Sequence, residues 1–397
     1  MNREKYKKIR LIIIICVFLL AFELFYIGYR SFNSGQKPVY FVGINSLEVN
    51  NDSYVTVGSN NDNDNHYEKA VVSLYNSKKE KEYEKLYNVG YNSAFFDVLI
   101  DEDSLVAVGS FEKTKEEHNN STRRALIVKY DSEGNVIFEH DFSVLDNSKF
   151  TSIIKSGDSY YVTGQSIYSN TKVGDDSGGA ILAKYDKDGN LVWSKTFGNS
   201  KESIFNDAII VGKYLYVVGM SENHSGVIVK YDMDGNYISS GNYNTCDVLG
   251  FSGIVYLNDS IYVCGSKKLS GNDTNALIVE YDYDCDYVGE KSFETTGKGR
   301  FNKMVVDDHN NIIVIGTISG EANRKNISFT DGVIAKYNAN LKLIDNVIYG
   351  DERDDYFTDV KINDGNYLVV GYSSYEDGSY MSKFISYSSA LKVLGVE

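Results

Sequence analysis

Three features recur in one order along almost the whole chain. The first is an apolar strand that ends in a repeat glycine, at Gly58, Gly109, Gly164, Gly219, Gly265, Gly316 and Gly371. The second is an apolar strand that ends in a repeat tyrosine, at Tyr75, Tyr130, Tyr185, Tyr231, Tyr281, Tyr337 and Tyr387. The third is an anchor residue about 14 positions before the glycine, at Ile44, Phe95, Phe150, Phe205, Phe251, Phe301 and Phe357. Successive repeat glycines are 46 to 55 residues apart, so the chain contains seven units of one kind.

This pattern predicts how each unit folds. Residues 179–197 read as an apolar strand, a tight turn at 186–190 and a second strand, and Tyr216 lies in a third strand that ends at Gly219. A fourth strand contains the anchor residue. The chain has 33 Tyr and 34 Gly but one Pro, and Tyr favours strands while Gly favours turns. Four short strands in about fifty residues are typical of a β-propeller blade.

A single four-stranded sheet cannot bury both of its faces, so neighbouring units must stack around an axis. Closing the ring of sheets also removes exposed sheet edges. We therefore expect an all-β, seven-bladed β-propeller of four-stranded blades over residues 39–397. Two ways of closing the ring are open, because either residues 391–396 or residues 39–42 can supply the outer strand of the last blade.

Residues 179–221, GAILAKYDKDGNLVWSKTFGNSKESIFNDAIIVGKYLYVVGMS, resemble the bacterial SBBP-type β-propeller repeat. That repeat pairs an a-x-v-a-k-x-x-x-d-G hairpin with an n-x-Y-v-t-G strand. The likeness covers residues 39–397 and is weakest in the first and last units. Some turns depart from the pattern: Cys285 stands where glycine is expected, and Asn340 and Ala390 lie near the corresponding turns. The resemblance implies an extracytoplasmic repeat domain, and it implies no reaction because the family shares no catalytic residues.

The first 38 residues differ from the rest. Residues 1–10 are basic, and the apolar run LIIIICVFLLAFELFYIG follows at 11–28, which is close to the length that spans a membrane. A cleaved signal peptide stays open, but no A-x-A-like site follows the run. We expect an uncleaved transmembrane signal anchor at 11–29 and a linker at 30–38. Lysine and arginine precede the run, which places residues 1–10 in the cytoplasm and the propeller outside the cell membrane.

Charge narrows the range of partners. The formal net charge is -15, and residues 1–30 contribute six basic residues against Glu4 and Glu23, so the remainder has a charge of -15 - 4 = -19. Such an acidic chain is a poor match for nucleic acid, because phosphate contacts need Lys and Arg. The five His are scattered, and the three Cys beyond the apolar run have no CxxC spacing. We expect no cofactor.

Two sets of acidic residues are candidate cation sites. Turns such as 186–190 have the pattern D-x-D/E-G-N, and we expect ordinary hairpins there rather than Ca²⁺ loops. The other set lies two residues after each anchor residue, at Ser46, Asp97, Ser152, Asp207, Gly253, Lys303 and Asp359. If these side chains line the channel, Asp97, Asp207 and Asp359 form a ring that could bind a metal or a cationic ligand. If the anchor residues pack between blades, the same side chains bond to neighbouring blades, and we favour this structural role.

No nucleophile elbow, P-loop or catalytic triad pattern is present in the sequence. These absences do not exclude an enzyme, because propeller sites are assembled from several blades. By analogy with other propellers, which combine a rigid ring with variable loops, we expect a non-enzymatic, membrane-anchored platform that binds a protein or an envelope polymer through loops on one face. Exposed tyrosines such as Tyr372 are candidate stacking surfaces for sugars. The alternative is a propeller enzyme that acts on envelope or extracellular glycans, which needs clustered acids with a raised pKa.

Overall fold

The computed structural model describes residues 42–396, apart from 51–52, 62–66, 121, 143, 145–146, 168–177, 199–201, 223, 244–247, 270, 296, 320–328, 351–352 and 375–379. The chain divides into two compact units, Met1–Tyr40 and Phe41–Glu397. The predicted cytoplasmic segment, transmembrane anchor and linker lie outside the described residues. Within the described ranges, no helix has the length and apolar character needed to cross a membrane.

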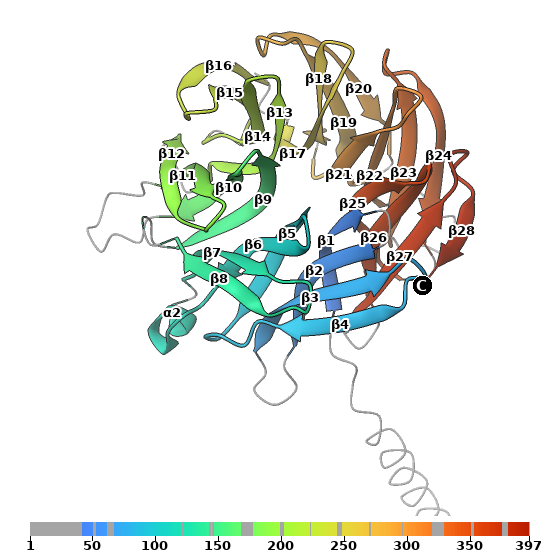
Figure 1. Ribbon diagram of the computed structural model, residues 1–397. Helices are drawn as coiled ribbons and strands as arrows, with labels where there is room; N and C mark the ends of the chain where they lie inside the picture. The colour runs from blue at the N-terminus through green and yellow to red at the C-terminus, as the bar shows by residue number, and fades with distance from the viewer. Residues whose placement is uncertain are drawn as a thin grey trace, which may run out of the picture. The chain divides into compact units, whose positions relative to one another are not determined.

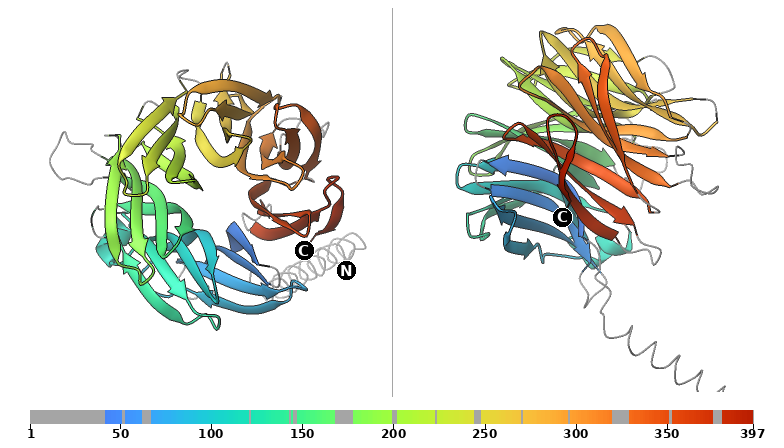
Figure 2. Two further views of the ribbon diagram at one scale, coloured as in Figure 1. Left: turned by 45° about the horizontal axis from the view of Figure 1, so that its top comes forward. Right: turned by 90° about the vertical axis from the view of Figure 1, so that its right-hand side faces the viewer.

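The described residues form seven antiparallel sheets of four strands each, which confirms the predicted all-β propeller. Each sheet is built from four consecutive strands in chain order, and the first of the four lies nearest the axis (Figures 1 and 2). The blades are, in chain order, β1 (Val42–Asn50), β2 (Ser53–Asn61), β3 (Glu68–Asn76) and β4 (Lys81–Leu86); β5 (Ser93–Asp101), β6 (Ser104–Phe111), β7 (Arg124–Tyr130) and β8 (Val136–Asp141); β9 (Ser148–Ser156), β10 (Ser159–Ile167), β11 (Gly178–Asp186) and β12 (Leu191–Phe197); β13 (Ile204–Val211), β14 (Tyr214–Met220), β15 (Gly226–Asp232) and β16 (Tyr237–Asn242); β17 (Val248–Leu257), β18 (Ser260–Lys268), β19 (Thr274–Tyr281) and β20 (Tyr287–Phe293); β21 (Gly299–Val306), β22 (Asn311–Ser319), β23 (Thr330–Asn338) and β24 (Leu343–Tyr349); and β25 (Asp355–Asn363), β26 (Asn366–Ser374), β27 (Tyr380–Tyr387) and β28 (Val393–Val396). A short helix, α2 (Lys115–Asn119), follows β6.

The seven blades surround a central axis (Figures 1 and 2). Each inner strand contacts the inner strand of the next blade, and β25 of the last blade contacts β1 of the first, which closes the ring. The last blade obtains its outer strand from β28, while β1 pairs with β2 inside the first blade. The ring therefore closes by packing of β25 against β1. The outer strand of the last blade lies within residues 391–396, which is the first of the two predicted alternatives.

A β-bulge at the anchor residue explains the repeat glycine. In the second blade, Phe95 lies opposite Gly109 and Asp97 lies opposite Val108, so Phe96 is an extra residue in the inner strand. The bulge pushes the carbonyl oxygen of the residue before the anchor against the repeat glycine. A Cβ atom at the repeat glycine would lie 1.7 to 2.4 Å from that oxygen in all seven blades, and real Cβ atoms keep at least about 3.0 Å. Only glycine fits this close approach.

The anchor residues and repeat tyrosines are packing residues. Phe95 and Tyr130 are buried and meet edge to face with ring centroids 6.3 Å apart. The same pair recurs in the next four blades, as Phe150–Tyr185, Phe205–Tyr231, Phe251–Tyr281 and Phe301–Tyr337. One hydrophobic cluster joins Val72 of the first blade to Phe95 of the second, so the core lies between adjacent sheets. This arrangement is the stacking that the repeat requires.

The turns between the third and fourth strands are hairpins, as predicted. Asp186 Oδ1 accepts hydrogen bonds from the backbone N–H groups of Asp188 (3.0 Å) and Asn190 (2.8 Å), and Gly189 has φ of 83°. Three later blades place other residues at the glycine position, with φ of 71° at Cys285, 55° at Leu341 and 53° at Leu391. These three side chains are buried, so packing offsets the strain of the positive φ.

Polar contacts join the second and third blades near the ends of their inner strands, β5 and β9. Lys129 Nζ lies 2.8 Å from Asp101 Oδ2 and 2.9 Å from the hydroxyl of Tyr160 in the next blade. The Tyr160 hydroxyl and Lys155 also donate to Asp101. Burial alone would raise the pKa of the Asp101 carboxyl, but these donors outweigh it and lower the pKa to about 2. The charged Asp101 carboxylate therefore links the second and third blades through hydrogen bonds and ion pairs.

Candidate functional site

The inner strands place two rings of polar side chains around the axis. The antiparallel order puts the start of every inner strand on one face of the propeller, which we call the anchor face, together with the connections from second to third strands and between blades. The opposite face has the short turns, and we call it the turn face. Residues directly after the anchor line the anchor-face end of the channel, and residues two after the anchor lie one step deeper.

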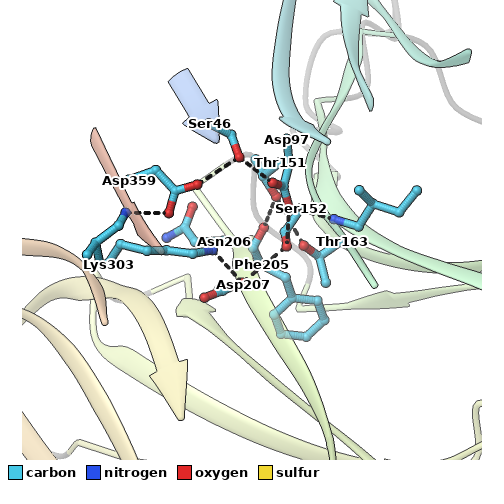
Figure 3. Close-up of polar contacts among 12 residues, drawn as sticks. Ser46, Asp97, Thr151, Ser152, Thr163, Phe205, Asn206, Asp207, Lys303 and Asp359 are labelled. Carbon is cyan, nitrogen blue, oxygen red and sulfur yellow. Dashed lines mark hydrogen bonds and ion pairs between the residues drawn. The ribbon is translucent and has the colours of Figure 1, made fainter. Parts of the chain in front are cut away.

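The structure brings the three predicted carboxylates together in the deeper ring (Figure 3). Ser46 Oγ lies 2.7 Å from Asp97 Oδ1 and 2.9 Å from Asp359 Oδ2. Ser152 Oγ lies 2.9 Å from Asp97 Oδ2 and 3.1 Å from Asp207 Oδ1. All five side chains are buried. A chain of polar contacts thus runs from the last blade through the first four.

Backbone amides and one lysine complete this inner network. Leu47 N–H donates to Asp359 Oδ2 and Ile153 N–H donates to Asp97 Oδ2, both at 2.9 Å, across blade boundaries. Lys303 Nζ lies 3.0 Å from Asp207 Oδ1. Burial disfavours the charged form of Lys303, but the three carboxylates outweigh burial and raise its pKa. Burial raises the pKa of the Asp207 carboxyl despite that lysine.

The inner network has fewer protons than contacts. Each serine hydroxyl has one proton but lies within hydrogen-bond distance of two carboxylates, so it can donate to only one of them at a time. Lys303 already supplies a positive charge to these acids. No cluster of three or more His, Cys, Asp or Glu that could hold a metal occurs in the described part of the chain. A cation at Asp97, Asp207 and Asp359 would compete with Lys303, and its binding stays a prediction.

The ring directly after the anchors joins neighbouring blades. Asn45, Asn206 and Asn302 each donate a side-chain N–H at 2.7 Å to the carbonyl oxygen of the next blade's anchor residue. Thr151 and Thr358 do the same through their hydroxyls, at 2.6 and 2.8 Å. The second blade has Phe96 at this position, and the fifth has Ser252. Our sequence reasoning missed this ring, although a polar residue after the anchor recurs in six of seven units.

Two cavities open on the anchor face. A cavity of about 260 Å³ is lined by this ring together with Lys149 and Arg300. A second cavity of about 630 Å³ is lined by Lys268, Lys298 and Tyr356 among others, and Arg300 lines both. None of the described residues that line either cavity is Asp or Glu, in a chain with 55 acidic and 40 basic residues. The turn-face end of the channel differs, because its cavity of about 310 Å³ mixes Glu48 with Lys155 and Lys361.

Lys149 and Arg300 occupy the position just before their anchor residues. The other five blades have Gly43, Ala94, Ile204, Gly250 and Tyr356 at that position. Lys149 and Arg300 are thus the two charged residues at a position that is uncharged in the other blades. This difference is visible in the sequence, but we did not predict a role for either residue. Burial lowers the pKa of both groups, and neither makes an ion pair with a carboxylate among the described residues. Lys149 and Arg300 therefore have no carboxylate partner among the described residues, whereas other cations of the anchor face, such as Arg124 and Lys267, are paired with acids.

Register, bulges and ring closure together define the class of this chain as a seven-bladed β-propeller. The chain is also similar to solved structures. Acylaminoacyl peptidase from Pyrococcus horikoshii has a TM-score of 0.52 and 9% sequence identity over 90% of this chain and 52% of that chain. The β-propeller domain of the Trilobed protease from Pyrococcus furiosus has a TM-score of 0.46 and 14% identity over 77% of this chain and 82% of that chain.

This chain spans about half the length of the peptidase. At such identities the likeness shows the fold alone. No family model and no curated protein matches the sequence.

Proposed function

We propose that this protein is a membrane-anchored, extracytoplasmic binding platform whose anchor face holds an envelope polymer or protein. The observation that supports this proposal most strongly is the cationic, carboxylate-free lining of both anchor-face cavities in an acidic chain. Uncompensated, half-buried charge is costly to a fold, and it is retained at sites that bind a ligand of opposite charge. The longer connections lie on the same face, where binding residues of propellers can vary without disturbing the sheets.

The anchored, extracytoplasmic location is part of the proposal. It is supported by the basic residues 1–10 ahead of the apolar run at 11–28. Protease added to intact cells should degrade the propeller and leave an N-terminal fragment in the membrane. A propeller that is protected in intact cells and cut only after lysis would contradict this location.

Affinity purification of the tagged full-length protein from its own membranes tests the platform directly. Thr317 lines the larger anchor-face cavity, so Thr317→Trp should fill that cavity and remove the bound partner or polymer. Lys213 is exposed in a turn on the opposite face, and Lys213→Trp is the matched control that should leave the recovered material unchanged. Equal recovery from wild type, Thr317→Trp and Lys213→Trp would argue against anchor-face binding.

A glycan-cleaving enzyme is the second candidate, and one observation favours it. Burial raises the pKa of the Asp207 carboxyl, and Asp207 shares Ser152 with Asp97, so two carboxyl groups lie close together. Both groups line the turn-face cavity. Turnover of envelope glycans that is abolished by Asp207→Asn, in a variant with the melting temperature of the wild type, would establish this alternative. Equal turnover by both proteins would reject it.

A further inference from the structure

The anchor-face end of the channel contains two cations with room beside them. Arg300 Nη2 lies 2.6 Å from Ser252 Oγ, and this hydrogen bond uses one of the five guanidinium N–H groups and fixes the plane of the group. Lys149 lines the same cavity. In the described ranges, neither cation has an Asp or Glu partner. Both groups therefore line a cavity with no Asp or Glu among its described lining residues.

Neutral donors surround these cations. Asn206 and Asn302 each use one side-chain N–H on the carbonyl of the next anchor residue, which leaves a second N–H on each amide. An oxyanion accepts several hydrogen bonds at once, and charge-assisted bonds from Arg are the strongest of them. The donor set of this cavity matches an oxyanion better than it matches a cation or an apolar group.

The cavities are large enough to admit a ligand larger than a single ion. The smaller cavity measures about 260 Å³, several times the roughly 30 Å³ that one water molecule occupies. Arg300 also lines the larger cavity of about 630 Å³, where Lys268 and Lys298 add positive charge. Tyr356 lines this cavity and stacks on Tyr372, with ring centroids 4.9 Å apart. A ligand held at Arg300 can extend from one cavity into the other.

We propose that Arg300 and Lys149 bind an oxyanionic group, a phosphate ester or a carboxylate, of a saccharide polymer whose next units lie in the larger cavity along Lys298 and Tyr356. This inference rests on the proposed binding function and names the chemistry of its ligand. Arg300 binds the oxyanion from the rim shared by the two cavities, and Lys149 binds it from the third blade. The acidic remainder of the surface disfavours contact with an anionic polymer elsewhere on the protein.

Stability measurements separate this role from a structural one. If a cation holds the fold together, neutralising it lowers the stability of the protein. An uncompensated half-buried cation instead makes the folded protein less stable. Lys149→Gln should therefore melt at the temperature of the wild type or above it. A melting temperature several degrees lower would assign Lys149 a structural role and contradict the proposal.

The test is equilibrium binding to the full-length protein in a non-ionic detergent. The probes are fluorescent oligosaccharides of equal length, one with phosphodiester groups, one with uronic acid groups and one neutral. We expect the wild type to bind at least one anionic probe, with affinity that falls as salt rises, and to leave the neutral probe free. The stronger of the two anionic probes identifies the source of the oxyanion.

Charge-matched variants then locate the site. Arg300→Gln and Lys149→Gln should each weaken binding of the anionic probe about tenfold or more, because each removes a charge-assisted contact. Lys213→Gln makes the same change in charge on the turn face and should bind within about twofold of the wild type. If Arg300→Gln fails to fold, Lys149→Gln decides the question. Unchanged affinity in Lys149→Gln, or binding of neither anionic probe by the wild type, overturns the inference.

The purification from membranes distinguishes this failure from failure of the platform. If wild type, Arg300→Gln and Lys149→Gln all recover the same partner, the platform stands and the oxyanion site is rejected. If the wild type recovers neither a protein nor a polymer from its membranes but binds an anionic probe in a manner lost in Lys149→Gln, the oxyanion site stands and the proposal that it holds an envelope component is rejected.

Discussion

The substitution Gly219→Ala tests why the repeat glycine exists. The new Cβ would lie 1.8 Å from the carbonyl oxygen of Ile204, 2.8 Å from its carbonyl carbon and 2.9 Å from the Cα of Phe205. Real Cβ atoms keep at least about 3.0 Å, so the two strands must separate by more than 1 Å next to a fully buried anchor residue. Overpacking a core costs about 1–3 kcal/mol when side chains can move, and here backbone must move. We therefore expect a loss of at least about 3 kcal/mol.

Thermal and urea unfolding of the full-length protein measure this loss. A change of about 1 kcal/mol shifts the melting temperature of a large domain by roughly 2–4 °C, so Gly219→Ala should melt at least about 6 °C below the wild type. Gly289 is the matched control, because it also lies in a strand and a Cβ there meets nothing within 4 Å. Gly289→Ala should leave stability unchanged or raise it by about 0.5–1 kcal/mol.

Equal melting temperatures for Gly219→Ala and the wild type would refute the bulge explanation. The glycine would then be replaceable, and its recurrence at seven positions would need another cause.

Three further predictions concern polar contacts between blades. Lysine and tyrosine donors lower the pKa of Asp101 to about 2, so the stability that its ion pairs give is present above about pH 4 and lost as pH falls towards 2. Asp101→Asn should lower the free energy of unfolding by about 1–2 kcal/mol at pH 6 and by much less at pH 2, as urea unfolding at both pH values would reveal. Lys303→Met should lower the free energy of unfolding by about 3–5 kcal/mol, because it leaves buried carboxylates without their cation, and adding Asp207→Asn should restore part of that loss. Additive effects of the two substitutions in a double-mutant cycle would contradict the ion pair. Asn206→Leu should lower the free energy of unfolding by about 1–2 kcal/mol, because it leaves the carbonyl oxygen of Phe251 without its hydrogen-bond donor. An unchanged denaturation midpoint would refute a stabilising role for that hydrogen bond.

The sequence was sufficient for the architecture because each blade is a local unit. The order of Phe95, Gly109 and Tyr130, repeated seven times, fixed the blade count and the packing roles, since residues within a blade are close in sequence. The bulge could not be foreseen, because an extra residue such as Phe96 leaves the apolar pattern of its neighbours intact. Ring closure was left open for a similar reason, as both ends of residues 39–397 have strand-forming sequences.

The site was predictable only in part. Alternation of side chains put Asp97, Asp207 and Asp359 on one face of their strands, but their partners come from other blades. Ser46 and Asp359 are 313 positions apart, and no local pattern reports such a contact. Lys149 and Arg300 were missed because each is a single departure from an otherwise uncharged position, and its meaning depends on the absence of acids in the cavities around it.

Photo-crosslinking in intact cells tests the central claim, that the anchor face is the binding face, most directly. A photoreactive amino acid is placed in the full-length protein at Thr317 in the larger anchor-face cavity, or at Lys213 on the turn face as the control. The account predicts adducts with an anionic envelope polymer from position 317 and none from position 213. Adducts that form only from position 213, or equally from both positions, would contradict it.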